Sequence, residues 1–122
     1  MLWKRKRPFD EELRQLAEAD TLAFGGTGIT GALPPAAKAY FTLEEGLRQH
    51  GAALRPRLEK LLDTAKPAGR LYAAELLTHV DADAGRAAWR RLAGQDGEVT
   101  TFQGCMMGST TIRRYAQDRL NP

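Results

Sequence analysis

The stretch from Leu54 to Leu92 constrains the fold most, because its apolar residues repeat with the period of an α-helix. Five of them follow one another at the offsets i, i+4, i+7, i+8 and i+11, namely Leu54, Leu58, Leu61, Leu62 and Ala65. Pro67 then opens a second helix at the first helical position, where its missing N–H costs nothing, and Asp81 is the expected N-cap of a third. Such helices must stack to bury their apolar faces.

The composition also favours helices over strands. The chain of 122 residues contains 19 Ala and 16 Leu against two Val and two Ile, and Ala and Leu are strong helix formers whereas β-branched residues dominate sheets. A chain of this length can bury enough surface to fold as one domain without a metal or a disulfide. We therefore predict an all-α fold of five to six helices, packed as antiparallel hairpins and joined by glycine-rich loops.

The expected elements follow from caps, prolines and glycines. We predict a basic flexible tail over residues 1–8 and a single helical domain over 9–122. Glycine-rich loops are expected over 20–33 and 104–108, and an extended segment over 99–102. The expected helices are 10–19, 34–50, 53–65, 67–79, 82–93 and a last one that Ser109 or Thr110 caps and that ends at 120. The residues predicted to be buried together are Leu58, Leu61, Leu62, Leu71, Tyr72, Leu76, Leu92 and Ile112.

Charge argues against specific nucleic-acid binding. The net charge of +3 comes from the run Lys4 to Arg7, and the rest of the chain has 14 basic and 15 acidic residues. A basic run of four residues supports at most weak, salt-sensitive binding. No apolar run is long enough to span a membrane, and no stretch resembles a signal peptide. We expect no membrane span and a cytoplasmic protein.

Three segments carry a resemblance to a known group. Residues 24–28 (Phe-Gly-Gly-Thr-Gly), 67–73 (Pro-Ala-Gly-Arg-Leu-Tyr-Ala) and 99–105 occur in an order that resembles small, uncharacterised bacterial proteins related to HEAT repeats. The resemblance covers residues 22–118. It implies a stack of helical hairpins, a fold used widely for binding other macromolecules, and it implies no catalysis.

One motif suggests a cofactor site, and its context argues against it. Residues 26–31 match the dinucleotide fingerprint G-x-G-x-x-G. That fingerprint works only between a strand and a helix of a βαβ unit, whereas here a predicted helix precedes it. We predict a tight loop and no cofactor.

Candidate catalytic and metal-binding residues are few. Cys105 together with His79 or His50 could form a thiol nucleophile, which needs a base in contact with the sulfur. A lone Cys is more often a small buried residue, and Met106 and Met107 beside it favour a packed loop. Two His and one Cys without paired spacing do not predict a zinc site. We predict neither a catalytic residue nor a metal ligand.

Several charged residues are expected to pair. Glu75 lies on an otherwise apolar helix, so it should bind Arg70 or an arginine of an adjacent helix. Arginines at 86, 90 and 91 share one helix and those at 113 and 114 another. They would form a positive patch if these two helices are neighbours, although a solvated helix face is the simpler interpretation.

We therefore predict a non-enzymatic module that binds another protein. The alternatives are an immunity-type inhibitor of a bacterial toxin and, less favoured, a Cys-dependent enzyme or a weak nucleic-acid binder. Loops on a rigid scaffold concentrate binding residues, so the candidate binding residues are Thr27 and Gly28 in one glycine-rich segment and Cys105 and Met106 in the other. The competing interpretation is that both loops cap the helical core and face each other.

Overall fold

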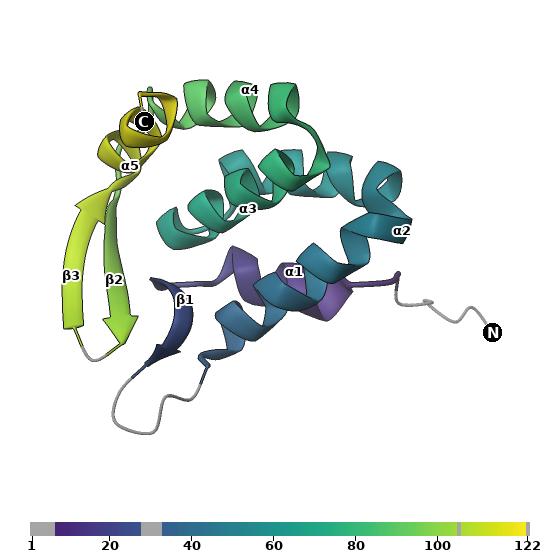
Figure 1. The fold of residues 1–122 in the computed structure, drawn as a ribbon, viewed down its shortest axis with the longest axis horizontal. Helices are drawn as coiled ribbons and strands as arrows, with labels where there is room; N and C mark the ends of the chain where they lie inside the picture. Colours follow the sequence, from purple (N-terminus) through teal and green to yellow (C-terminus); the bar gives the residue numbers. More distant parts are fainter. Residues whose placement is uncertain (1–6, 28–32, 105, 122) are drawn as a thin grey trace.

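The computed structural model describes residues 7–27, 33–104 and 106–121 (Figure 1), with the side chains of 25–27 and 104 left out. Most of the described chain is helical. The predicted tail falls almost wholly outside it. In chain order the elements are α1 (Asp10–Ala17), β1 (Thr21–Thr27), α2 (Pro35–Thr64), α3 (Pro67–Val80), α4 (Ala82–Leu92), β2 (Glu98–Gly104), β3 (Met106–Thr111) and α5 (Ile112–Leu120).

Helix α3 is the centre of the core, as its low polarity predicts. Leu71, Tyr72 and Leu76 are completely buried, and α2, α4, α1 and α5 all pack against α3. The eight residues predicted to be buried together all belong to the same cluster. The mainly helical architecture is thereby confirmed.

The helix boundaries match the sequence signals at most positions. The Asp81 side chain accepts a hydrogen bond of 2.7 Å from the Ala84 N–H and caps α4, as expected. Helix α2 is continuous where two helices were predicted, but it kinks at His50, whose φ of −123° and ψ of 16° are not helical. The last helix begins later than predicted, because Thr111 caps α5 by accepting from the Arg114 N–H.

The prediction of an all-α fold is wrong, because the described residues include a three-stranded sheet of order β1-β2-β3. Strands β1 and β2 are parallel, with Thr21 opposite Thr100, and β2 and β3 form an antiparallel hairpin with Gln103 opposite Met106. Two predicted loops therefore contain strands: residues 21–27 form β1 and residues 106–111 form β3. The β1–β2 pairing joins segments far apart in sequence, which local patterns cannot reveal.

The sheet is attached to the helices by apolar packing and by the start of α5. Leu22 of β1, Val99 of β2 and Ile112 of α5 are buried in the common core. The Ile112 N–H also donates to the Gly97 carbonyl at 2.9 Å. The sheet thus packs against the helical layer along one side, and β3 forms its outer border (Figure 1).

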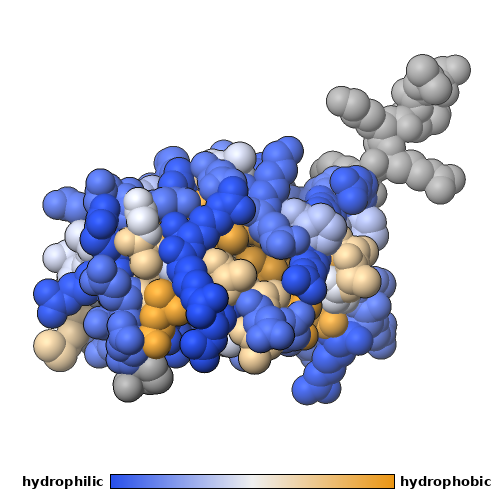
Figure 2. Space-filling view, turned by 90° about the horizontal axis from the view of Figure 1, so that it is seen from above, coloured by the Kyte–Doolittle hydropathy of each residue, from blue (hydrophilic) through white to orange (hydrophobic). Residues whose placement is uncertain are grey.

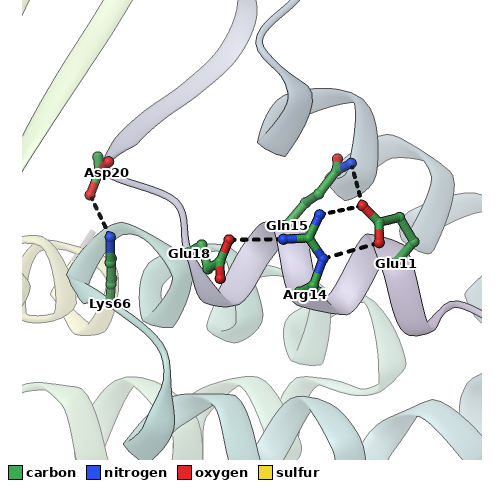
Figure 3. Close-up of polar contacts among 6 residues, drawn as sticks. All are labelled: Glu11, Arg14, Gln15, Glu18, Asp20 and Lys66. Carbon is green, nitrogen blue, oxygen red and sulfur yellow. Dashed lines mark hydrogen bonds and ion pairs between the residues drawn. The ribbon is translucent and has the colours of Figure 1, made fainter.

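Polar contacts hold α1 and the start of β1 against the α2–α3 junction (Figure 3). The Lys66 N–H donates to the Ala17 carbonyl at 2.8 Å, and the Lys66 ammonium lies 3.4 Å from Asp20. On the outer face of α1, Arg14 bridges Glu11 and Glu18. The two contacts of Lys66 link the segment between α1 and β1 to the start of α3.

Candidate protein-binding edge

The outer edge of β1 is closed by a tyrosine. The Tyr72 hydroxyl donates a hydrogen bond to the Ala23 carbonyl and accepts one from the Ala23 N–H, and each bond is 2.8 Å long. The N–H and C=O of Ala23 lie on the same side of the strand, so the Tyr72 side chain takes the place that a further strand would occupy. Burial raises the pKa of Tyr72, and its hydrogen bond with Ala23 partly offsets that rise.

The opposite edge of the sheet, along β3, is open. The β2–β3 register places Gly108 opposite Thr101 and Thr110 opposite Val99, and the bond from Ile112 to Gly97 continues the same series. Hydrogen-bonded pairs alternate along an antiparallel ladder. The peptide groups of the intervening residues, Met107, Ser109 and Thr111, therefore point away from β2 along the open edge, and Thr111 ends the strand as the N-cap of α5.

The side chains of β3 add apolar surface to this edge. Among the described residues, three large apolar side chains are exposed; two of them are Met106, 76% exposed, and Met107, 68% exposed. The strand Met106–Thr111 contains neither a charged residue nor a proline. Natural edge strands usually carry such residues to prevent pairing with other chains. The edge of β3 lacks this protection, so it can accept another strand.

The structure describes only some of the four predicted binding residues. Met106 is exposed at the start of β3. Thr27 ends β1, and its Cα lies opposite that of Gly104 in β2, so the two glycine-rich segments do meet. Gly28, Cys105 and the side chain of Thr27 lie outside the described residues.

Sequence reasoning missed Met107 and Ser109, whose peptide groups line the open edge. The segment was interpreted as a loop because of its glycines. The sequence does contain a signal for strands here, because residues 99–101 (Val-Thr-Thr) and 109–111 (Ser-Thr-Thr) are both rich in β-branched residues.

A second polar site lies between α2 and α3. His79 Nε2 is 3.0 Å from Glu44 Oε2 and 3.4 Å from the Tyr40 hydroxyl. An open hollow of about 600 Å³ adjoins the pair. Its lining residues are Phe41, Glu44, Glu45, Leu47, Arg48 and His79.

The polar groups beside this hollow contact one another. Burial is the main cause of the raised pKa of Tyr40, followed by the nearby charges of Glu44 and Glu75. The phenol therefore stays protonated at neutral pH and serves as a hydrogen-bond donor. His79 is engaged by Glu44, and the described residues that line the hollow include no Ser, Thr or Cys. The Cys-dependent site stays a prediction because Cys105 lies outside the described residues.

Glu75 pairs with an arginine of an adjacent helix, which was one of the two predicted partners. Its carboxylate, on a side chain 15% exposed, lies 2.7 Å from Arg119 Nη2 of α5 and 3.3 Å from the Tyr115 hydroxyl. Burial, then the Glu75 charge, raises the pKa of Tyr115. Arg70, the other predicted partner, instead binds Gln95 and the carbonyls of Ala65 and Asp63.

The arginines of α4 and α5 are partly neutralised, although the two helices are neighbours. Arg91 pairs with Asp63, and Arg113 pairs with Asp96. In the described part of the chain, Arg86, Arg90 and Arg114 have no acidic partner. Figure 2 shows the side on which α4 lies as mostly hydrophilic, with apolar atoms in small areas between charged side chains. This face is typical of a solvated surface.

Comparison of the chain with protein-family models, curated proteins and solved structures finds no match. Within residues 7–27, 33–104 and 106–121, no helix has the length and apolar character needed to cross a bilayer. The same residues contain no group of three His, Asp or Glu side chains placed to hold a metal.

Proposed function

We propose that the protein is a non-enzymatic protein-binding module whose β3 edge accepts an extended segment of a partner protein. The observation that carries the proposal is the asymmetry of the sheet: Tyr72 closes the outer edge at Ala23, whereas the edge along Met107 and Ser109 is open.

Strand addition uses the features that β3 presents. An added strand gains affinity from main-chain hydrogen bonds and specificity from its alternate side chains. Met107 and Ser109 supply the outward N–H and C=O groups, and the flexible thioethers of Met106 and Met107 adapt to irregular apolar partners. The helical core supports the hairpin from one side through Val99 and Ile112, so the strand need not order on binding.

The expected partner segment is uncharged and prone to extended structure. Because β3 itself carries no charge, an incoming Lys, Arg, Asp or Glu beside it would find no pairing group on the strand. Thr, Val, Ile and aromatic residues pack well across a strand pair. The partner of this chemistry is a β-prone segment of another protein.

A peptide selection tests this mode of binding. A displayed library of random peptides would be selected on the wild-type protein and screened against Ser109→Pro and Ser109→Ala. Proline removes an N–H that faces away from β2, a place where edge strands tolerate it, and alanine keeps the N–H. We expect enriched peptides to be β-prone and uncharged, to bind wild type and Ser109→Ala, and to lose binding to Ser109→Pro. Enriched peptides that bind all three proteins equally would contradict the proposal.

Two narrower predictions belong to this proposal. The first is that the stacked helices α1 to α5 are HEAT-like. The second is that the partner is a bacterial toxin and the protein its immunity-type inhibitor. A toxin gene next to the gene for this chain, and neutralisation of that toxin by wild type but not by Ser109→Pro, would support the second.

A further inference from the structure

We infer that β3 also pairs with β3 of a second copy of this chain, antiparallel about a two-fold axis through Gly108. The inference rests on the proposed function of β3 as an open edge. The product is a symmetric dimer in which two three-stranded sheets join into one continuous sheet. A partner segment and the second copy would then compete for the same edge.

The register of this pairing follows from the outward peptide groups. Within β3, Gly108 and Thr110 are directed at β2, and the outward Thr111 ends the strand as the N-cap of α5. Met107 and Ser109 are therefore the outward residues that a ladder inside the strand can use. An antiparallel two-fold pairing centred on Gly108 places Met107 opposite Ser109 of the second copy, and each such pair exchanges both N–H···O=C bonds. A pairing shifted by one residue would oppose outward groups to inward ones and form no ladder.

The residue at the axis suits a close approach. Gly108 faces Gly108 of the second copy in a non-hydrogen-bonded pair, where Cα atoms come within about 4.5 Å. Two glycines have no side chains to collide there. On either side Met106 opposes Thr110 of the second copy, a long apolar side chain beside a β-branched one.

Charge permits the pairing, since no charged residue lies in β3 itself. The charged residues that adjoin β3 in the ladder or in the sequence, Glu98 opposite Thr111 and the arginines at 113 and 114 in α5, lie at the Thr111 end of the strand. The two-fold axis sends these ends to opposite sides of the dimer, so like charges do not meet across it.

The closed edge of β1 limits the assembly to two chains. A sheet with two open edges could add copies without end, whereas an isologous contact through a single open edge closes on itself. The hydrogen bonds between Tyr72 and Ala23 occupy the other edge. The structure therefore favours a dimer over a filament.

The test is the oligomeric state of the full chain by sedimentation velocity over a wide range of protein concentration. Wild type and Ser109→Ala should show a concentration-dependent monomer–dimer equilibrium, and Ser109→Pro should remain monomeric at the concentrations where wild type dimerises. Wild type that stays monomeric throughout would overturn the inference of a dimer. The proposed function would then still be tested separately, by the peptide selection. Equal dimerisation of Ser109→Pro would also overturn it.

A cross-link tests the register directly. In a chain with Cys105→Ser, Gly108→Cys should form a disulfide between copies under mild oxidation, since the Cα separation at the axis falls in the range that disulfides need. Thr110→Cys, displaced from the axis, is the matched control and should cross-link far less. An equal yield of covalent dimer from both variants would contradict the register.

Discussion

The Tyr72 hydroxyl is hydrogen-bonded to both backbone groups of Ala23, donating to the carbonyl and accepting from the N–H at 2.8 Å. Tyr72 comes from the centre of α3, and Ala23 from the first strand of the sheet. A single side chain of the helical core thus occupies the place of a neighbouring strand. This contact makes the two edges of the sheet unequal, and the proposed binding mode depends on that inequality.

Replacing Tyr72 by Phe should destabilise the protein by about 1–3 kcal/mol, because the Ala23 N–H and C=O would be left buried without partners. Chemical denaturation measures the change. Tyr40→Phe is the control: its hydroxyl makes only long contacts, 3.5 Å to Glu44 and 3.4 Å to His79, so its loss should cost less. An equal effect of the two substitutions would mean that the Ala23 contact is not what holds β1.

Truncating Leu76 to Ala should lower the free energy of unfolding by about 2–5 kcal/mol, since Leu76 is fully buried in α3 and its removal leaves a cavity. Met106→Ala, at an exposed position, should change it by no more than about 0.5 kcal/mol. Urea or thermal unfolding of both variants checks the prediction. A Leu76→Ala protein with unchanged stability would refute the central position of α3.

Gly69→Ala should also destabilise, for a reason specific to its neighbour. A Cβ at Gly69 would lie 2.0 Å from the Leu16 carbonyl oxygen of α1, a backbone atom that cannot move alone. Overpacking of this kind costs about 1–3 kcal/mol. Gly51→Ala in α2 is the matched control, because nothing lies within 4 Å of its Cβ position and alanine favours the helix by roughly 0.5–1 kcal/mol. The two variants should therefore shift the melting temperature in opposite directions; a shift in the same direction would be inconsistent with this packing.

Stability should fall in alkali because of the tyrosines. Burial, the first cause in each case, raises the pKa of Tyr40, Tyr72 and Tyr115 in the folded protein, whereas tyrosine in the unfolded chain ionises near pH ~10. The unfolded state thus loses protons first, so this stabilisation is complete below pH ~10 and decreases as pH rises above it. Denaturation curves measured across this pH range should show that the free energy of unfolding decreases less steeply with pH for Tyr115→Phe than for wild type. The same decrease in both would exclude Tyr115 as a contributor.

The helices could be predicted because their signals are local. The leucines of α2 recur at helical spacing, Pro67 starts α3 and Asp81 caps α4, so the pattern within each segment is sufficient. The kink at His50 lies where the predicted helix 34–50 ends. Burial of Leu71, Tyr72 and Leu76 followed from the apolar character of α3.

The sheet could not be predicted because its stability is non-local. Strand β1 contains two glycines and strand β3 one, and glycine is depleted in strands. Neither strand shows a clear alternation of apolar and polar residues. The sheet forms because Thr21 meets Thr100 and because Tyr72 binds Ala23, contacts that join distant parts of the chain. The candidate binding residues were therefore expected in loops, whereas the structure places Met106, one of them, at the exposed start of β3.

The most direct test of the open edge is amide hydrogen exchange along β3, residue by residue, at low protein concentration and then with a selected peptide bound. In the free protein, Met107 and Ser109 should exchange fast while Gly108 and Thr110, bonded to β2, are protected. The selected peptide should slow exchange at Met107 and Ser109 and leave Gly108 and Thr110 unchanged. Slow exchange at Met107 and Ser109 in the free monomer, or bound peptide without added protection there, would contradict the account.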